Sequence, residues 1–558
     1  MNKEQKTAAI HIKIHGIHGR LTSIGNHFHY IGQAILGEQI LSAPSLLQYI
    51  KELISKQQLA QGILKLNGFY AFTYQHNNTV YAVTDRLRSR PLFYAIHKKT
   101  LYLSDSTTWL NQQFSGKSIN RQGEMELIRA GYISGEDTLI TEMQQIEAST
   151  LFTYQTNCIK KQKYYHFMPK NSSKLIANSA LFAPLDKALT QSINRLISLA
   201  NGRQIVIPLS GGFDSRIIAL YLKQANYHNI VTFTFGKITS QEVRISQSIA
   251  NGLNLPWHFV EYNRKRWRKA QKSTDFNAFL LFISSFTSVP NVQVYPAIKA
   301  LQQNGVINAN AIIVPGHTGD FSSGGHIPST LMAIPAQGNA KAIVNCIIGK
   351  HYHCKKPTDL DSRLIAKISL QVDALLQADA LLQADALLQA DALSQADALS
   401  RVSSLLTASK QSPACSVYEA WEFNERQAKF IVNSNRYYDY RKLDWWMPLW
   451  DNALIDFWQH IAPLANRHNS GLWQEFINLK SREMLSEAAP QTNASEHYSA
   501  FTQRIRAIFD YFTDPNALYT LVPFHRWLLR KLKYPNANGT VFSYLAEKTS
   551  NHQQKQIK

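Results

Sequence analysis

The sequence predicts an α/β protein with more than one domain, and three patterns support this. Residues 1–165 alternate short apolar runs with polar turns, which is typical of antiparallel strands. A strand, a helix and a second strand then follow within about 30 residues, and this βαβ order requires a parallel sheet. From Cys415 onward the pattern is mainly helical and rich in Trp. A chain of 558 residues also exceeds the ~100–200 residues that one hydrophobic core normally serves.

The N-terminal strands are predicted at Gly68–Tyr74, Val80–Val83, Pro91–Ile96 and Leu101–Ser104. Aromatic and β-branched side chains recur at about every second position of these segments, as they do in strands. Polar turns of the HNN and HKK kind separate them. This part of the chain is therefore expected to form antiparallel sheet.

The parallel unit follows a helix that is expected over Pro184–Leu199. Ile205–Leu209 (IVIPL) is a short buried strand, Ser215–Gln224 is a helix, and Ile230–Phe235 (IVTFTF) is a second strand. Because parallel neighbours need a crossover connection, this order predicts a parallel sheet.

Composition and charge narrow the classes of function. Hydrophobic residues make up 45% of the chain and charged residues 17%, which excludes a largely disordered protein. A balance of 59 Lys and Arg against 38 Asp and Glu gives a net charge of +21. This charge attracts nucleic acid, anionic membrane surfaces or phosphorylated small molecules, without choosing among them. The densest basic clusters, Asn263–Lys272 and Arg526–Lys533, are interpreted as solvated faces.

The expected location is cytoplasmic. No apolar run approaches the ~18–20 residues of a bilayer helix, and the N-terminus has no apolar signal region. Four Cys cannot build a disulfide framework. Cys346, His351, His353 and Cys354 form a compact group, but their spacing matches no zinc pattern, so we expect no metal site there.

A six-residue unit repeats over Val372–Ser400, as VDALLQ, ADALLQ, ADALLQ, ADALSQ and ADALS. Ala, Leu and Gln favour helix. Six residues advance a helix by about 600°, so the Leu pairs cover all of its sides and form no single stripe. We interpret the segment as a low-complexity helical insertion within a loop, with a partner surface as the alternative.

The strongest functional motif is Leu209–Arg216, LSGGFDSR, between the predicted strand and helix. Gly211 and Gly212 lack a Cβ, which lets backbone N–H groups approach phosphate oxygens. The helix presents its positive N-terminus to the same anion. Ser210 and Ser215 add hydroxyl donors, so the motif predicts a phosphate site.

Asp214 of this motif would repel phosphate unless a cation lay between them, so it implies Mg²⁺. The loop lacks the Lys of a Walker A motif. The one Gly-Lys-Ser of the chain, Gly116–Ser118, has Asn111 where the first Gly belongs and is rejected as a P-loop. An ordinary glycine turn capped by Asp and Ser is the structural alternative.

The hexapeptide SGGFDS resembles the pyrophosphate-binding (PP) loop of ATP pyrophosphatases, which split ATP to AMP and pyrophosphate. The whole chain resembles the asparagine synthase family through further blocks. Leu66–Phe72 (LNGFYAF) and Asp85–Tyr94 (DRLRSRPLFY) are similar to the glutaminase domain of that family. Pro315–Gly325 (PGHTGDFSSGG) resembles its second nucleotide-side loop, and Trp445–Asp451 (WWMPLWD) resembles a block near the start of its C-terminal helices.

The resemblance implies a domain plan. An Ntn-hydrolase-like αββα sandwich, a glutaminase-like domain of the class II amidotransferase type, is expected over residues 1–165. A parallel-sheet domain of the adenine-nucleotide α-hydrolase-like (PP-loop) type, with a helical extension, is expected over residues 180–558. The repeat at 372–400 is an insertion within this second domain.

The glutaminase half-reaction is expected to be lost. The family uses an N-terminal Cys as nucleophile and free α-amine, whereas position 2 is Asn2 and no Cys precedes Cys158. A carboxamide cannot form a thiolate-like nucleophile. Asn67 and Gly68, which match the oxyanion-hole positions of the family, are expected to keep a structural role.

The resemblance also implies the synthetase site. Asp214 and Asp320 match the acidic residues that share Mg²⁺, and His317 replaces a Glu near the incoming nitrogen nucleophile. A neutral His can accept a proton from an attacking amine, and a structural His at a tight turn is the alternative. The residues expected to bind ATP are Leu209, Ser210, Gly211, Gly212, Asp214, Ser215, Phe235 and Gly316.

A late Lys neutralises pyrophosphate in the family. Lys531 or Lys533 is assigned to this role, with Arg526 and Arg530 equally close in sequence.

The implied reaction is ATP-dependent amide formation: a small-molecule carboxylate is converted to an acyl-adenylate, which ammonia or an amine then attacks. Aspartate to asparagine is the default of the family, and a sugar uronate or a peptide carboxylate is the alternative. A tRNA-modifying PP-loop protein and a non-catalytic scaffold are the other classes. We expect no membrane partner and no nucleic acid, and a homodimer stays open.

Overall fold

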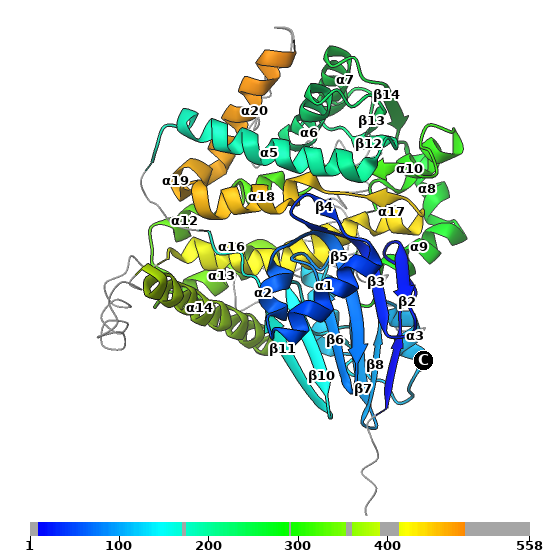
Figure 1. The fold of residues 1–558 in the computed structure, drawn as a ribbon. Helices are drawn as coiled ribbons and strands as arrows, with labels where there is room; N and C mark the ends of the chain where they lie inside the picture. The colour runs from blue at the N-terminus through cyan, green and yellow to red at the C-terminus, as the bar shows by residue number, and fades with distance from the viewer. Residues whose placement is uncertain (1–8, 170–174, 290–291, 353–359, 391–411, 486–558) are drawn as a thin grey trace, which may run out of the picture.

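The structure is a computed structural model that describes residues 9–169, 175–289, 292–352, 360–390 and 412–485 (Figure 1). Strands of the N-terminal part, blue to cyan in Figure 1, form one end of the molecule. A second, parallel sheet lies at the other end, and helices from the last third of the chain lie between the two.

Two sheets build the N-terminal part. The larger has the order β11-β10-β6-β5-β3-β2 with β4 on β3, and all its pairings are antiparallel. The smaller has the order β1-β8-β7-β9, in which β1 and β8 are parallel. The strands are β1 (Ile10–Lys13), β2 (Leu21–Ile24), β3 (Phe28–Leu36), β4 (Gln39–Ile40), β5 (Leu66–His76), β6 (Thr79–Thr84), β7 (Phe93–His97), β8 (Thr100–Ser104), β9 (Gln144–Gln145), β10 (Thr150–Gln155) and β11 (Cys158–Lys163).

Helices cover the outer faces of these sheets. α1 (Ala43–Ser55), followed by α2 (Leu59–Leu64), packs on β2 and β3, while α3 (Thr107–Gln112) packs on β7 and β8. Side chains such as Ile31 and Leu103 fill the space between the two sheets. The predicted αββα sandwich is therefore confirmed, and burial of its apolar faces is what holds the layers together.

The second sheet has the order β14-β13-β12-β15-β16, and every pairing in it is parallel. Its strands are β12 (Ile205–Pro208), β13 (Ile230–Gly236), β14 (Trp257–Glu261), β15 (Ile312–Ile313) and β16 (Asp444–Trp445). The helix α6 (Phe213–Gln224) connects β12 to β13, which confirms the predicted βαβ unit. Strand β16 was not expected from the sequence.

Helices surround this sheet and form the rest of the described chain. The preceding helix α5 begins at Ser179, five residues before the expected start, so Pro184 lies inside it. The remaining helices are α4 (Arg121–Ala130), α5 (Ser179–Ala200), α7 (Gln241–Gly252), α8 (Arg264–Gln271), α9 (Thr274–Ser284), α10 (Tyr295–Gln303), α11 (Gly319–Ser322), α12 (Ser329–Met332), α13 (Ala340–His351), α14 (Ser362–Ala390), α16 (Ala414–Glu422), the π-helical η2 (Phe423–Ile431), η3 (Val432–Asn435), α17 (Arg436–Tyr440), η4 (Pro448–Trp450), α18 (Asn452–Asp456), η5 (Phe457–Ile461), α19 (Leu464–Arg467), η6 (His468–Ser470) and α20 (Gly471–Met484). Within the described ranges, no helix is long and apolar enough to cross a bilayer.

The repeat differs in context from the expectation. Helix α14 starts at Ser362, so the repeat begins inside a helix that is already formed and not in a loop. Val372, Leu375 and Leu376 are buried against α13 and α16, whereas Leu381 is 68% exposed. The first unit therefore belongs to a packed core, and the repeat from residue 391 onward lies outside the described residues.

A buried ion cluster joins the N-terminal part to the helices. The Asp439 carboxylate accepts hydrogen bonds from Arg90 Nη1 at 3.1 Å, Arg436 Nη1 at 3.0 Å and Trp445 Nε1 at 2.8 Å. Burial works against the charged carboxylate, but the two guanidinium groups and His18 outweigh it and lower the pKa of Asp439 to about 2. The two parts of the chain thus share a charged, hydrogen-bonded contact.

Candidate functional site

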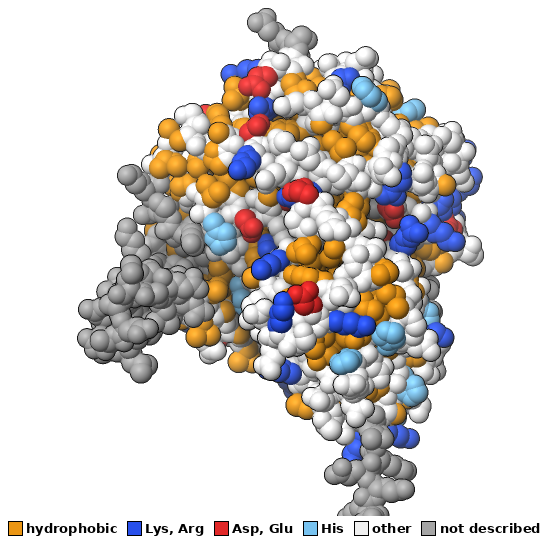
Figure 2. All heavy atoms as spheres, in the orientation of Figure 1, with side chains coloured by type: hydrophobic (Ala, Val, Ile, Leu, Met, Phe, Trp, Pro, Cys, Tyr) orange, Lys and Arg blue, Asp and Glu red, His pale blue; other side chains and the backbone are white. Residues whose placement is uncertain are grey.

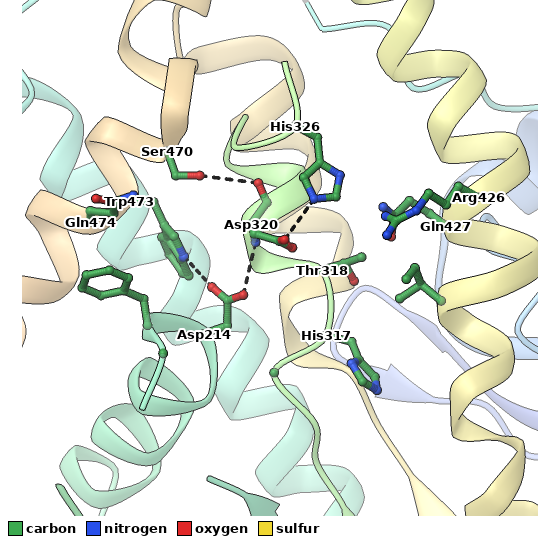
Figure 3. A pocket seen from close by; sticks show the side chains of 14 residues that line it. Asp214, His317, Thr318, Asp320, His326, Arg426, Gln427, Ser470, Trp473 and Gln474 are labelled. Carbon is green, nitrogen blue, oxygen red and sulfur yellow. Dashed lines mark hydrogen bonds and ion pairs between the residues drawn. The ribbon is translucent and has the colours of Figure 1, made fainter. Parts of the chain in front are cut away.

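A cavity of about 430 Å³ lies at the carboxyl edge of the parallel sheet. Four segments line it: the start of α6, the loop around α11, η2 and the start of α20 (Figure 3). Its lining residues are Gly212, Phe213, Asp214, Gly316, His317, Thr318, Asp320, His326, Arg426, Gln427, Ile431, Ser470, Trp473 and Gln474. The cavity therefore brings together both loops that the sequence singled out.

The SGGFDS loop is held in shape by its own hydroxyls. Ser210 N donates to Ser215 Oγ at 3.0 Å, and Gly212 N donates to Ser210 Oγ at 3.2 Å. Both hydroxyls are thus engaged within the loop and set the turn that leads from β12 into α6. Gly212 is the N-cap residue of α6 and provides no side-chain acceptor, so the first turn of the helix carries backbone donors toward the cavity.

The two glycines of the loop have different surroundings. A Cβ on Gly211 would lie 3.3 Å from Glu242 Cα and from Ile245 Cβ, so Gly211 permits close packing of the loop on α7. A Cβ on Gly212 would meet only Ser210 Oγ within 4 Å, and Gly212 is exposed. Of the two, Gly212 is the one that faces the cavity.

The second loop packs directly on the start of α6. A Cβ on Gly316 would lie 2.5 Å from Ser215 N, and a Cβ on Gly319 would lie within 2.5 Å of the Asp214 carboxylate. Any larger residue at either position would push the two loops apart. The glycines of the PGHTGD segment therefore set the approach of Asp320 to Asp214.

The Asp214 carboxylate receives two donors from other segments. Trp473 Nε1 donates to Oδ1 at 2.8 Å, and the Asp320 backbone N–H donates to Oδ2 at 3.2 Å. Burial and the nearby charge of Asp320 nevertheless raise the pKa of Asp214 to about 7. Asp320 thus lies close enough for its charge to act on Asp214. The pKa of Asp320 itself is lowered, because burial is outweighed by the contact with His326.

Asp320 interacts with a histidine that the sequence did not assign. Its Oδ1 accepts from Phe321 N at 2.8 Å, and its Oδ2 lies 3.0 Å from His326 Nε2. The other ring nitrogen, His326 Nδ1, contacts Glu422, whose side chain is fully buried. Burial disfavours the charged ring, but the charges of Glu422 and Asp320 outweigh it and raise the pKa of His326 to about 9.

His317, in contrast, points away from the carboxylate pair (Figure 3). Its Nε2 lies 3.1 Å from Ser434 Oγ on η3. Burial lowers the pKa of His317 to about 4, so the ring is neutral at pH 7. It lines the cavity, but on the side away from Asp214 and Asp320.

Gly212, Asp214 and Gly316 of the expected ATP set line the cavity, whereas Leu209, Ser210, Gly211, Ser215 and Phe235 do not. Leu209 is 1% exposed, and its carbonyl accepts from Thr234 Oγ1 at 2.7 Å. Phe235 stacks on Tyr262 with ring centroids 4.9 Å apart, at the end of β13. Leu209 and Phe235 thus pack at the ends of β12 and β13.

The predicted oxyanion-hole pair lies at the junction with the helices. Asn67 Nδ2 donates to Asp451 Oδ2 at 2.8 Å, and Arg195 binds the same carboxylate through two bonds. Gly68 has φ of +106°, and a Cβ there would lie 3.2 Å from the Trp446 ring. These positions are thus occupied by contacts with the rest of the chain. A second cavity, of about 510 Å³, is lined from both sides of this junction, by Phe69 and Trp446 among others.

Several predicted residues lie outside the described part of the chain: Asn2, Arg526, Arg530, Lys531, Lys533, His353 and Cys354. Of the Cys/His group, His351 is buried, with Nε2 2.7 Å from Tyr418 Oη. Of the basic cluster on α8, Lys265, Arg266 and Lys269 are exposed, and Figure 2 shows basic side chains gathered on the side where Figure 1 places α8.

The sequence did not single out His326, Arg426, Gln427, Ser470, Trp473 or Gln474, which all line the cavity. His326 directly follows the quoted Pro315–Gly325 segment, and that position was the available signal for it. Arg426 and Trp473 are distant in sequence from both loops, and no local motif marks them.

Comparison with known proteins finds a family model and several solved structures that are similar to parts of this chain. Among solved structures, an NH3-dependent NAD synthetase from Campylobacter jejuni matches with 13% identity and a TM-score of 0.19. The match covers 42% of this chain and 95% of that chain. A glutamine phosphoribosylpyrophosphate amidotransferase from B. subtilis matches with 11% identity over 53% of this chain and 63% of that chain, with a TM-score of 0.19. An allosteric regulatory enzyme of purine biosynthesis matches with 12% identity and a TM-score of 0.17, over 59% of each chain.

The chain thus spans about six tenths of the length of the last two proteins. At these identities and TM-scores the likeness says nothing about what this chain binds or catalyses. No curated protein matches the chain. A family model does match: residues 52–165, within the αββα part, are similar to a glutamine amidotransferase domain.

Proposed function

We propose that the chain is an ATP-dependent amide-forming synthetase that takes its nitrogen from ammonia or an amine. A substrate carboxylate attacks the α-phosphate of ATP, which gives an acyl-adenylate and pyrophosphate. The nitrogen nucleophile then attacks the acyl carbon, loses a proton and releases AMP. Aspartate is the first acid to test, and a sugar uronate or a peptide carboxylate is the alternative.

The observation that carries this proposal is the pairing of Asp214 and Asp320 beside the open start of α6. A helix N-terminus with a glycine N-cap suits a phosphate group. A carboxylate whose pKa is raised by burial and by the charge of a neighbouring carboxylate, as for Asp214, suits a divalent cation, which would relieve the repulsion. Mg²⁺ in nucleotide sites is commonly held by one or two carboxylates together with substrate phosphates.

Asp214 and Asp320 would therefore hold Mg²⁺, which when bound would neutralise charge on the phosphates. The chain's own residues position this pair. Trp473 fixes one oxygen of Asp214, and His326 fixes one oxygen of Asp320. His317, neutral at pH 7, is available to take the proton of the attacking amine, although a pKa of about 4 makes it a weak base.

The amidotransferase-like domain is proposed to be silent in this reaction. Asn67 is committed to Asp451, and Gly68 is covered by Trp446. Together with Asn2 in place of a nucleophilic Cys, these contacts favour free ammonia or an amine as the nitrogen source.

The test is release of pyrophosphate and AMP from Mg-ATP, with ammonium or glutamine and a panel of carboxylates led by aspartate. Release that requires ammonium, ignores glutamine and falls at least about 100-fold in Asp214→Asn would support the proposal. Asp373→Asn, which changes an exposed carboxylate of α14, is the matched control and should behave as wild type. Release driven by glutamine would contradict the silent domain. ATP binding without AMP release under any condition would favour the scaffold.

A further inference from the structure

We propose that Arg426 contacts the phosphate chain of the nucleotide and neutralises the departing pyrophosphate. This inference rests on the proposed function and assigns to a described residue the role that was expected of a late Lys. It is carried by the position of Arg426, by its contacts and by the geometry of its helix.

Arg426 lies on η2, across the cavity from the carboxylate pair (Figure 3). Among the described residues that line this cavity, it is the only Lys or Arg. Its side chain is 28% exposed, so it is accessible from the cavity yet partly withdrawn from bulk water. A cation opposite two carboxylates leaves between them a space suited to a phosphate chain with its metal ion.

Glu422 positions the Arg426 side chain. Glu422 is fully buried, and its Oε1 accepts from Arg426 Nη1 at 3.2 Å and from Gln427 Nε2 at 3.1 Å. Within the described ranges, the guanidinium has no second hydrogen-bond acceptor. A guanidinium has five N–H donors, so most of them stay available to a ligand.

The π-helical winding of η2 brings Arg426 and Ile431 to the same cavity. Five residues along a regular α-helix would turn these side chains about 140° apart, at 100° per residue. The wider π turn reduces this angle. Such π segments occur frequently at functional sites, and here the segment brings Arg426 to the cavity that the start of α6 also lines.

The chemistry of arginine suits this role. A guanidinium stays charged at every working pH and binds phosphate oxygens through paired N–H donors. Charge develops on the pyrophosphate as its bond to the α-phosphorus breaks, so a fixed cation stabilises the transition state more than the ground state. Arg426 would therefore contribute more to turnover than to ATP affinity.

The experiment measures binding of inorganic pyrophosphate and of AMP, both with Mg²⁺, to the full chain. Arg426→Gln should weaken pyrophosphate binding about 10- to 100-fold, the range expected for charged hydrogen bonds, and leave AMP binding unchanged. Arg426→Lys keeps the charge without the paired donors and should recover part of the loss. Arg363→Gln, on the exposed face of α14, is the control and should bind as wild type.

Thermal melting distinguishes this role from a structural one. If Arg426 only neutralised Glu422, Arg426→Gln would lower the melting temperature and weaken AMP and pyrophosphate alike. Equal pyrophosphate binding in wild type and in folded Arg426→Lys and Arg426→Gln would overturn the inference and leave the proposed function standing. If wild type binds neither ATP nor pyrophosphate, the proposed function fails, and the inference fails with it.

Discussion

At the scale of single residues, the carboxylate of Asp214 depends on a donor from a distant helix. Trp473 Nε1 reaches it from α20, 259 positions along the chain. An indole N–H is a donor only, so it favours the charged carboxylate over the protonated form. Trp473 therefore helps to hold in place the carboxylate that we propose binds Mg²⁺.

Trp473→Phe tests this contact, because it removes the donor and keeps an aromatic ring of similar volume. We expect pyrophosphate release to fall about 10-fold, as for a lost hydrogen bond to a charged group, while the protein stays folded. Steady-state kinetics and circular dichroism check both statements. Trp458→Phe is the control: its Nε1 has no hydrogen-bond partner among the described residues, so a comparable loss there would point to packing.

Sequence reasoning singled out the two carboxylates and His317 but did not single out His326. Both His317 and His326 follow glycine-rich turns, and nothing local distinguishes them. The distinction comes from Glu422 on α16, which draws His326 to Asp320, and from Ser434, which draws His317 away. Partners that lie 96 and 117 positions away cannot be identified from a motif.

At the scale of elements, the close contact between the second loop and α6 rests on Gly316. A Cβ there would lie 2.5 Å from Ser215 N and 2.9 Å from the Asp214 carbonyl carbon, and backbone cannot yield as a side chain can.

Gly316→Ala should therefore separate Asp320 from Asp214 and lower pyrophosphate release by about 10-fold or more, since misplacement by about 1 Å can cost 100-fold. Nucleotide turnover and binding measure the effect. Gly349→Ala in α13 is the matched change, because a Cβ at this position would meet no described atom within 4 Å. It should raise the melting temperature slightly, since Ala has a higher helix propensity than Gly. Normal turnover in Gly316→Ala would contradict the assigned approach of the loops.

Elements with a strong local pattern were predictable. The strands β5 to β8 and the β12–α6–β13 unit begin and end within two residues of the positions predicted from the sequence. Strand β16 was not predictable, because two residues, Asp444 and Trp445, carry no strand pattern and gain their pairing only from β15. The start of α14 before the repeat was missed because the repeat itself dominated the pattern.

At the scale of the molecule, the contact through Asp439 should contribute strongly to stability. Asp439→Asn removes a charge that two buried guanidinium groups share, and such losses cost about 3–5 kcal/mol. Urea unfolding measures the change. Asp444→Asn is the matched control. Asp444 pairs with Arg203, but its side chain is 55% exposed, so loss of this ion pair should lower the unfolding free energy by at most about 1 kcal/mol. Equal losses in the two variants would contradict this ranking.

The same carboxylate predicts a pH dependence. Its pKa in the folded protein, about 2, lies below the ordinary value of 3.8, so its stabilising effect is complete above about pH 4 and is lost as the pH falls toward 2. The lowered pKa is worth about 2 kcal/mol. The difference in unfolding free energy between wild type and Asp439→Asn should therefore narrow over this interval. A difference independent of pH from 5 to 2 would show that the charge is not responsible.

The order of the sequence patterns predicted the order of the main parts of the fold, whereas it did not predict the contacts between them. The αββα part, the parallel sheet and the helical extension appear in the predicted order. The cavity, however, is closed by η2 and α20, whose approach depends on packing over the whole chain. The one Trp of these two elements, Trp473 on α20, is 2% exposed, so its burial alone does not distinguish it from a core residue.

The bond between Asn67 and Asp451 has a consequence for engineering. An N-terminal domain transplanted from a working glutaminase would bring its own Asn, but that side chain would be needed for chemistry and could no longer anchor Asp451 and Arg195. In such a chimera the same Asn could not both serve glutamine hydrolysis and anchor the N-terminal part to Asp451. If the amidotransferase-like part is silent, as we propose, restoring glutamine use would also require redesign of the contact that Asn67 makes with Asp451.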